Sequence, residues 1–451
     1  MAFLAPTLAL MAALQATSTD APAAPQCLSI SDAIETSLEY DPRVEASAAD
    51  QLAARANVMA AYSRNLPQVS AFGQSGFGDT PPLDRRSDEQ AGLQLQQELY
   101  SFGSRRYAIE AAKAQHEAAR HGVNEAQVSV AQGIAQAYLE HARSLELAAL
   151  AGEQEAAFGE EAATAESRLS RQVITLTDAS QITARFARAR SDALAAGVEV
   201  EASLARLEVL LGHQVKCLDE DASHDTLTRN APAVLGMAPV VAVDEALIRS
   251  ARIARVQAQL KAARATAEEA ERAGLPTIAL NGFVLWERGN FPDETGLTFE
   301  ERIERESRIG VSLSQELFTG GRNRARALEG NSRVRGARAE ARFQELAVED
   351  AVRRALARAK AQRDAAAALT DARNAASVQK DGTQREYDVG TKTLTDLVLA
   401  TESFFIAATQ ETNARYDYYL SLVQLYAAMN MLNELDVPMA QGAPTVPVQD
   451  G

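Results

Sequence analysis

The chain has 451 residues, and its long tracts of Ala, Glu, Arg, Gln and Leu favour helix, while aromatic residues make up only 5%. A net charge of −16 disfavours nucleic acid as the main partner. No stretch approaches the roughly eighteen consecutive apolar residues of a transmembrane helix, so any membrane-spanning part must consist of β-strands.

The start of the chain suggests export. Residues 1–26 contain the apolar run and the following small residues of a signal peptide. No Lys or Arg precedes that run, and a disordered leader rich in Ala and Pro is the alternative. In an exported protein the two cysteines, Cys27 and Cys217, are a candidate disulfide, with two free thiols as the alternative.

One stretch occurs twice and organises the rest of the chain. It reads GLQLQQELYSFG at 92–103 and GVSLSQELFTGG at 310–321, 218 residues later. Apolar and polar residues alternate, which predicts a strand with two different faces. The predicted apolar side of the first copy is Leu93, Leu95 and Leu99, and the predicted polar side is Gln94, Gln96 and Glu98. A turn containing glycine then opens a helical pattern of more than sixty residues, a rod of roughly 100 Å.

Two structural repeats follow from this duplication. The first, over 27–218, is predicted to contain a helix over 29–65 bent near Pro42, a β-hairpin over 67–101 with a polar loop at 79–90, and a helical hairpin over 103–212 that turns at 170–175. The second, over 241–435, is predicted to contain a helix over 243–273, a β-hairpin over 276–319 with a loop reaching 306, and a helical hairpin over 321–432 that turns at 387–393.

The connecting segments are predicted to be irregular. Residues 219–240 are expected to be a linker that begins with an acidic loop, and 436–451 a disordered tail. His224 could hold a cation in the acidic loop, but a solvated linker is the simpler interpretation.

Neither repeat is expected to fold alone. Two hairpins supply only four strands, too few to close a barrel, and open strand edges in lipid leave backbone groups without hydrogen bonds. The helices have narrow apolar stripes that also require neighbours. A homo-oligomer with one shared barrel follows from these constraints.

The residues resemble the TolC family of outer-membrane channel-tunnels. The resemblance covers about 28–435, and its motifs are DPRVEASAAD at 41–50, NLPQ at 65–68, the turns ending at Gly103 and Gly321, YDVGTKTLTD at 387–396, NARYDYY at 413–419 and LYAAMN at 425–430. It implies a mainly α fold with a membrane β portion: a homotrimer in which each chain gives four strands to one outer-membrane β-barrel, continued across the periplasm by a long α-helical barrel.

The resemblance also implies roles for the two helical turns, which would form a periplasmic tip where the tunnel narrows and an adaptor docks. The implied docking residues are Arg171, Gln172, Val173, Val389, Gly390 and Thr391. Tyr387 and Lys392 would bond to Asp178 of a neighbouring coil and hold the entrance shut, and Asp396 would form a ring of carboxylates facing the pore. Leu399 stands where the best-known members carry a second ring Asp, so the ring here is single.

Simpler structural roles exist for the same tip residues. TLTD occurs at 175–178 and at 393–396, and both copies fit capping boxes in which Thr and Asp satisfy the first turn of a helix. Gly390 fits a turn that requires positive φ. Capping and gating are compatible roles for Asp178 and Asp396.

Several aromatic residues could form belts at the ends of the barrel strands, with general packing as the alternative. These residues are Phe72, Phe77, Tyr100, Phe283, Trp286 and Phe318. No enzyme signature is found, because the five histidines lack metal-ligand spacing and no phosphate-binding loop or nucleophile elbow occurs.

The sequence therefore predicts a passive exit duct in the outer membrane that uses no metal or cofactor. Its expected partners are outer-membrane lipid, a periplasmic adaptor and an inner-membrane transporter, either an ABC transporter or a proton-driven pump. Cargo would be drugs or unfolded secreted proteins. The alternative is a soluble periplasmic coiled-coil scaffold without a pore, which predicts no β content.

Overall fold

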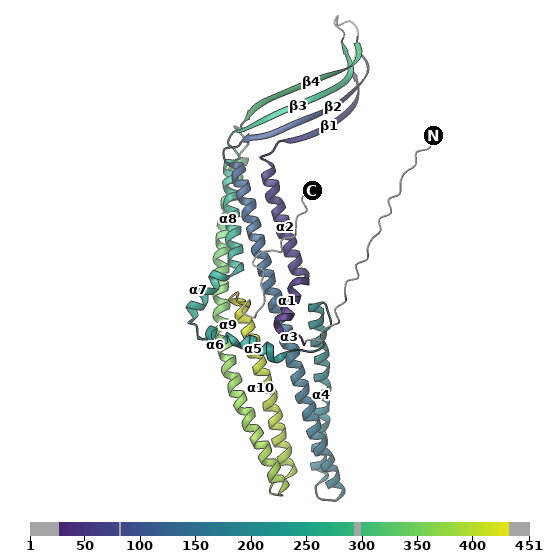
Figure 1. The fold of residues 1–451 in the computed structure, drawn as a ribbon, viewed down its shortest axis with the longest axis vertical. Helices are drawn as coiled ribbons and strands as arrows, with labels where there is room; N and C mark the ends of the chain where they lie inside the picture. Colours follow the sequence, from purple (N-terminus) through teal and green to yellow (C-terminus); the bar gives the residue numbers. More distant parts are fainter. Residues whose placement is uncertain (1–26, 81–82, 293–298, 433–451) are drawn as a thin grey trace, which may run out of the picture.

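A computed structural model describes residues 27–80, 83–292 and 299–432. The predicted leader at 1–26 and the predicted tail at 436–451 lie outside the described residues. Four strands form one end of an elongated molecule, and helices run from them to the far end (Figure 1). We call that far end, where the two helical hairpins turn, the tip.

The predicted duplication is visible in the order of the elements. The first repeat contains α1 (Ile30–Tyr40), α2 (Pro42–Ser63), β1 (Gln68–Thr80), β2 (Leu83–Tyr100), α3 (Ser104–Ser170) and α4 (Leu176–Leu211). The second contains α7 (Pro239–Arg249), α8 (Ala251–Arg272), β3 (Thr277–Pro292), β4 (Phe299–Ser314), α9 (Arg322–Asp388) and α10 (Leu394–Ala428). Helices α3 and α9 each have 67 residues, and glycines with positive φ precede both, Gly103 and Gly321.

The opening helix of each repeat is interrupted. Asp41 ends α1 and caps α2, where its carboxylate accepts the Arg43 N–H at 2.7 Å and the Arg43 guanidinium at 2.7 Å. The break or bend expected near Pro42 is confirmed as a break. The single helix expected over 243–273 is wrong, because Ser250 ends α7 and caps α8 through the Ile253 N–H. No proline marks this second break, so helical periodicity alone missed it.

The strands are longer than expected. Most of the polar loop predicted at 79–90 belongs to β1 and β2, and β3 and β4 occupy most of the loop predicted before 306. The strand expected to end at Phe318 ends at Ser314 instead. Polar residues pair as well as apolar ones through backbone hydrogen bonds, so polarity was a poor sign of a loop here. The alternative of a coiled-coil scaffold without β content is contradicted by these strands.

The sheet has the antiparallel order β1-β2-β3-β4, and its register separates two faces. Leu95 lies opposite both Val69 and Gly282, and Gly282 lies opposite Ile309. We call this side the apolar face; its apolar members are Val69, Ala71, Gly73, Ala91, Leu93, Leu95, Tyr100, Ile278, Leu280, Gly282, Val284, Trp286, Ile303, Ile309, Val311 and Leu313. Its polar members include Gln97 and Ser307 and, toward the end far from the helices, Glu89, Arg288 and Arg305. The opposite, polar face includes Gln94 and Gln96. The predicted alternation is confirmed except at Leu99, since a register shift there makes Tyr100 the partner of Ile278.

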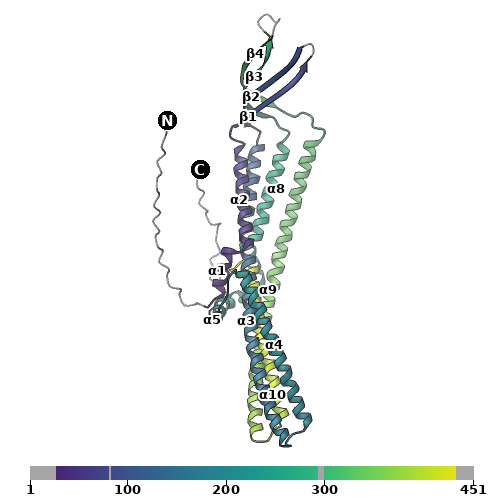
Figure 2. The ribbon, with the colours of Figure 1, turned by 90° about the vertical axis from the view of Figure 1, so that its right-hand side faces the viewer.

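Two short helices share the space between the two long ones. Both α8 and α10 pack against α3 on one side and α9 on the other, with α8 nearer the sheet and α10 nearer the tip (Figures 1 and 2). On the other side of α3, α2 and α4 occupy the same two levels. The chain is thus a curved wall in which α3 is internal, while α9 lies at one edge and α2 and α4 lie at the other.

The main core lies at mid-length, where the short helices meet. Its largest fully buried side chains include Ile34, Tyr138, Leu227, Tyr416 and Tyr426. The expected linker takes part in it, because 220–236 folds into α5 (Glu220–Arg229) and α6 (Ala231–Gly236) rather than an acidic loop. His224 stacks on Tyr419 with ring centroids 4.5 Å apart, and burial lowers its pKa.

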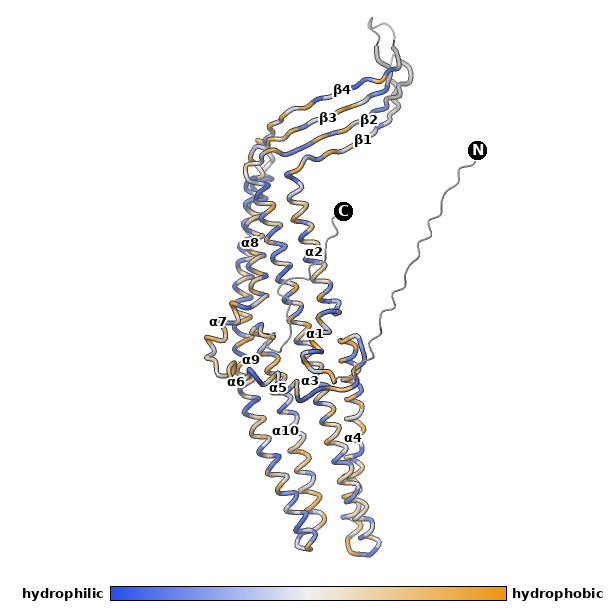
Figure 3. The backbone as a smooth tube through the Cα atoms, viewed as in Figure 1, coloured by the Kyte–Doolittle hydropathy of each residue, from blue (hydrophilic) through white to orange (hydrophobic). Residues whose placement is uncertain are grey.

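Apolar and polar residues alternate along nearly every element (Figure 3). Within the described ranges, no individual helix combines the length and hydropathy needed to cross a membrane. Only the sharply bent pair Glu220–Gly236 and Pro239–Arg249 meets both requirements when its two members are taken together.

A disulfide joins Cys27 to Cys217, with Cα atoms 4.8 Å apart, so it links the start of the first repeat to its end. Next to it, Leu28 and Leu218 form a parallel bridge in which Leu28 N–H donates to Cys217 O at 2.9 Å. The Tyr138 hydroxyl donates to Leu28 O at 3.0 Å and anchors this segment to α3.

The disulfide is expected to stabilise the chain by restricting the unfolded state. It spans 190 residues, for which chain entropy gives about 5 kcal/mol in the free energy of unfolding. The double variant Cys27→Ser/Cys217→Ser should melt at a lower temperature by circular dichroism, and reductant should lower the melting temperature of the wild type only. Intact mass under non-reducing conditions showing two free thiols in exported protein would contradict the bond.

Candidate functional site

The two tip turns have the same backbone geometry. In the first, Gln172 N–H donates to Leu169 O and Val173 N–H to Arg168 O, each at 2.9 Å. In the second, the equivalent bonds run from Gly390 to Tyr387 O at 2.9 Å and from Thr391 to Glu386 O at 2.8 Å, 218 residues later. The expected positive φ of Gly390 is present at 82°, and Gln172 adopts 58° at the matching position. A left-handed conformation costs a non-glycine residue about 1–2 kcal/mol, so the first turn is the more strained.

Both predicted capping boxes are present. The Thr175 hydroxyl donates to the Asp178 carboxylate at 2.8 Å and accepts the Asp178 N–H at 3.1 Å. In the second box the Thr393 hydroxyl donates to Asp396 at 2.7 Å and the Thr393 N–H donates at 3.0 Å. These bonds from Thr393, helped by the Lys392 charge, hold the pKa of Asp396 below its usual range. Asp396 is therefore a carboxylate at neutral pH.

Apolar side chains project from the tip. Val173 is 65% exposed, Val389 is 76% exposed and Leu176 is 69% exposed. Arg171, Gln172, Gly390 and Thr391 complete the same two turns. Each turn thus exposes a valine to solvent, and the apolar surface at the tip has no partner within the described chain.

Tyr387 packs against the small apolar cluster that joins the two helical hairpins near the tip, which includes Phe158, Ile182 and Leu397. The Arg168 guanidinium lies 4.8 Å from its ring centroid. The Tyr387 hydroxyl is buried and has no hydrogen-bond partner among the described residues. Within one chain, the described contacts join neither Tyr387 nor Lys392 to Asp178, whose carboxylate is engaged in its capping box. The lock between neighbouring coils stays a prediction.

Polar contacts join α3 and α4 to α10 above the tip. Glu161 on α3 accepts a hydrogen bond from the Thr401 hydroxyl at 3.2 Å, and Arg185 on α4 forms an ion pair with Glu402 at 2.8 Å. The second oxygen of Glu161 is buried without a partner. Sequence analysis missed these contacts, because their partners are more than 200 positions apart and each lies in an ordinary charged helix.

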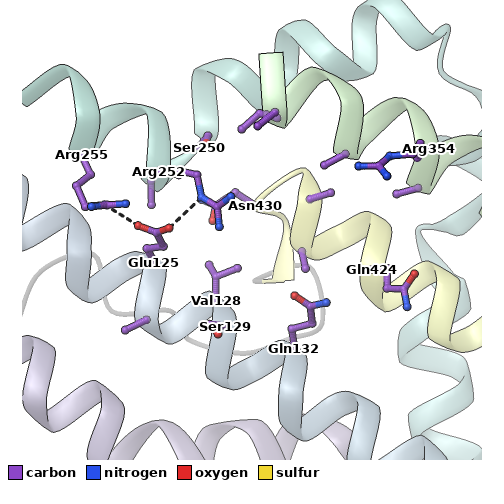
Figure 4. A pocket seen from close by; sticks show the side chains of 18 of the residues that line it. Glu125, Val128, Ser129, Gln132, Ser250, Arg252, Arg255, Arg354, Gln424 and Asn430 are labelled. Atoms are coloured by element: carbon purple, nitrogen blue, oxygen red, sulfur yellow. Dashed lines mark hydrogen bonds and ion pairs between the residues drawn. The ribbon is translucent and has the colours of Figure 1, made fainter. Parts of the chain in front are cut away.

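A cavity of about 870 Å³ lies where α8 begins and α10 ends, between α3 and α9 (Figure 4). Glu125 on α3 accepts hydrogen bonds from Arg252 at 2.9 Å and Arg255 at 2.7 Å, both on α8. Arg354 of α9 and Gln424 of α10 also line it. These ion pairs join α8 to α3 near the start of α8, where α10 ends.

The aromatic residues divide between the two faces of the sheet. Tyr100 and Trp286 lie on the apolar face, whereas the register places Phe72 and Phe283 on the polar face. Phe318 lies beyond β4 and is exposed. The side chain of Phe77 lies outside the described residues. A complete aromatic belt stays a prediction.

Within the described part of the chain, no three His, Cys, Asp or Glu side chains gather to hold a metal ion. The most buried histidine, His141, contacts the Ser203 hydroxyl at 3.0 Å through its Nδ1. Ser203 in turn contacts Ser144 at 2.7 Å, so this group joins α3 to α4.

A sheet with one apolar face and two paired helical hairpins that extend about 100 Å from it define a channel-type membrane protein. Residues 33–213 and 242–431 match the family described as outer membrane efflux protein, and the chain belongs to this family.

Curated relatives cover nearly the same length. The chain is 25% identical over 400 residues to the outer membrane protein TolC of Vibrio cholerae, covering 88% of this chain and 90% of that protein. It is 27% identical over 395 residues to the outer membrane efflux protein BepC of Brucella suis, covering 86% of this chain and 82% of that protein.

Solved structures share the fold. The Campylobacter jejuni CmeC outer membrane channel matches with a TM-score of 0.74 and 17% identity, covering 89% of this chain and 85% of that chain. The open state of the Neisseria gonorrhoeae MtrE outer membrane channel matches with a TM-score of 0.72 and 19% identity, covering 89% and 88%. The resemblance to the TolC family, the mainly α fold with its β portion and the outer-membrane location extending into the periplasm are confirmed. Members of this family are channel proteins rather than enzymes.

Glu161 is expected to make the stability of the folded chain depend on pH. Burial raises the pKa of its carboxyl to about 7, against the smaller opposing effects of Thr401 and Arg185. The folded chain therefore binds this proton more tightly than the unfolded chain, and stability is lost as the pH rises from about 4.5 to 7. Glu161→Gln should flatten the dependence of melting temperature on pH in this interval. Glu160→Gln, which changes an exposed neighbour, should leave this pH dependence unchanged. Equal slopes of melting temperature against pH in the wild type and Glu161→Gln would contradict the assignment.

Proposed function

We propose that three copies of this chain close into one tube that serves as a passive exit duct across the outer membrane and periplasm. The observation that carries this proposal is that both the sheet and the helical wall have open edges in a single chain. The number three comes from the resemblance to the TolC family. Three copies would supply twelve strands to one closed barrel.

The unequal burial of the two long helices supports closure. Helix α3 has 18 buried residues, whereas α9, of the same length, has six. At about 100° per residue, α9 also presents exposed apolar side chains away from its buried stripe, and these are Leu328, Phe343, Leu346 and Val378. An uncovered apolar stripe on a rod of this length requires a neighbour.

The opposite edge of the wall offers the matching surface. Helices α2 and α4 expose Leu52, Met59, Leu194, Val198 and Val209. By the repeat, α9 corresponds to α3, while α2 and α4 correspond to α8 and α10. The internal packing of α3 against α8 and α10 is therefore a template for α9 packing against α2 and α4 of the next copy.

Placing a charge on the α9 edge should prevent assembly. Leu346 is 64% exposed, and Leu346→Glu should abolish trimers in native gels and pore conductance in planar bilayers, because the carboxylate would be buried between copies. Arg358→Glu is the control, since Arg358 lies on the same helix but lines the cavity beside α10. Equal loss in both variants, or conducting trimers of Leu346→Glu, would contradict the proposed edge contact.

The tip is the proposed meeting point with partners. The exposed Val173, Leu176 and Val389 suit an adaptor that covers them, and an inner-membrane ABC transporter or proton-driven pump would supply the energy. One relative carries the name efflux protein and another the name TolC, so both drug efflux and secretion of unfolded protein agree with the resemblance. The Asp396 carboxylates would form a single cation-selective ring.

The proposed gate uses Tyr387 and Lys392 of one coil and Asp178 of a neighbouring coil. The buried, unpartnered hydroxyl of Tyr387 supports it, because such a group normally finds a hydrogen-bond acceptor in the complete assembly. Opening would be an untwisting of the tip helices once the adaptor breaks these links.

Reversing either charge of the gate should open it. Asp178→Arg and Lys392→Glu should each raise single-channel conductance of reconstituted trimers severalfold. Asp178→Asn separates the gate from the capping box, since an amide oxygen at this N3 position can still accept the Thr175 N–H while the charge is removed. Unchanged conductance in both charge reversals would contradict the lock.

A further inference from the structure

The cavity between α3 and α9 at mid-length has an excess of positive charge. Four arginines line it, two from α8 and two from α9, namely Arg252, Arg255, Arg354 and Arg358. Glu125 is the one acidic residue in the described lining, and Arg354 is paired with Asp350. Two positive charges per copy are therefore left without a carboxylate, in a chain whose net charge is −16.

The two arginines of α8 are fixed in orientation. Both donate to Glu125 through Nε, Arg252 at 2.9 Å and Arg255 at 2.7 Å, and their guanidinium groups lie on either side of its carboxylate (Figure 4). Neither guanidinium forms another hydrogen bond with the described residues. The Arg252 side chain is 50% exposed and the Arg255 side chain 32%. The terminal nitrogens of each guanidinium, which form the fork that binds an oxyanion, therefore remain available.

The remainder of the lining includes small apolar side chains. Helices α9 and α10 contribute alanines and α3 contributes a valine: Ala347, Ala351, Ala355, Ala427, Ala428 and Val128. The volume of about 870 Å³ lies in the range of sites for drug-sized ligands, about 300–1,000 Å³. Arginines beside an apolar surface match an organic anion better than a small inorganic one, which would leave the apolar part of the cavity unfilled.

The cavity and α7 lie on opposite faces of the wall. A smaller pocket beside α7 is lined by Gln257 of α8 and Glu345 of α9. At about 100° per residue, Gln257 lies about 160° around α8 from Arg255, and Glu345 lies about 180° around α9 from Arg354. In an open duct α7 must lie outside the wall, because three copies of it inside would occupy the lumen. The cavity then opens toward the lumen.

We propose that this cavity binds organic anions, carboxylates or sulfonates with an apolar body, as they pass through the duct. The terminal nitrogens of Arg252 and Arg255 bind the charged group, and the alanines contact the apolar body. Glu125 is a positioning residue, because its two oxygens fix both guanidinium groups. The cavity lies within one chain, so binding does not require assembly, whereas the role in transport rests on the proposed duct.

The first test measures binding of naphthalenesulfonate to the purified full chain in non-ionic detergent by equilibrium dialysis. Arg252→Gln/Arg255→Gln should weaken binding at least tenfold, and Arg252→Lys/Arg255→Lys should recover part of it, because Lys keeps the charge and loses the fork. Lys261→Gln/Arg264→Gln is the matched control and should change binding less than twofold. It also removes two cations from α8, including one paired with Glu117 of α3 at 3.4 Å, but neither residue lines the cavity.

The second test asks whether these charges face the lumen. At about 10 mM salt the screening length is about 30 Å, so charges on the inner wall influence the permeating ions. In a potassium chloride gradient across planar bilayers, Arg252→Gln/Arg255→Gln should shift the reversal potential toward that of potassium. Lys261→Gln/Arg264→Gln, which removes the same number of charges from the outer side of α8, should leave the reversal potential unchanged.

The outcomes separate the binding site from the duct. Equal weakening by the two Gln pairs, or none by the first, overturns the site even when trimers conduct. Equally tight binding of neutral naphthol, or displacement of the sulfonate by an equal concentration of inorganic phosphate, also overturns an organic-anion site. Normal binding with no shift in reversal potential overturns the role in transport. A wild type that binds the sulfonate but forms no conducting trimers contradicts the duct and the role in transport, and leaves the site itself supported.

Discussion

Open edges are the constraint from which most of this structure follows. The sheet ends at β1 and β4, and the helical wall ends at α9 on one side and at α2 and α4 on the other. A sheet edge in lipid leaves its backbone groups without hydrogen bonds, and an apolar stripe along α9 remains in water. In the proposed assembly, rotation of one copy onto the next closes both the sheet and the helical wall. One proposed interface would therefore cover the open edges of both.

The two repeats share a backbone geometry but differ in the side chains at equivalent positions. The tip turns share their hydrogen bonds, yet Gln172 occupies the left-handed position that Gly390 fills in the other copy. Along the long helices, Glu125 of α3 forms ion pairs with α8, while the matching position of α9 is the exposed Phe343. The contact between α3 and α8 inside a chain is thus charged at a position where the proposed contact of α9 with the next chain is apolar. Such a difference disfavours mispairing of the two contacts, because Phe343 in place of Glu125 offers no partner to the arginines of α8.

The sequence predicted the elements well where physical signals are local. Alternation predicted the strand at Gly92, and the TLTD motifs predicted both capping boxes. The break at Ser250 and the helix α5 were missed, because a cap without proline and an acidic helix leave no distinct pattern. Long-range polar contacts such as that of Glu161 with Thr401 depend on tertiary packing, which one sequence does not encode locally.

The contacts above the tip limit how the end of the molecule can move. Glu146 on α3 bonds both Thr412, at 3.2 Å, and Arg415 on α10 near mid-length, and the contacts of Glu161 and Arg185 with α10 lie closer to the tip. Nearest the turns, the hairpins are joined by the small apolar cluster around Phe158, Ile182 and Leu397 and by Arg168 against Tyr387. Polar links between exposed helices exchange readily with water, whereas the large buried core at mid-length does not. A motion that separates the hairpins at the tip would leave the mid-length core, the disulfide and the sheet in place.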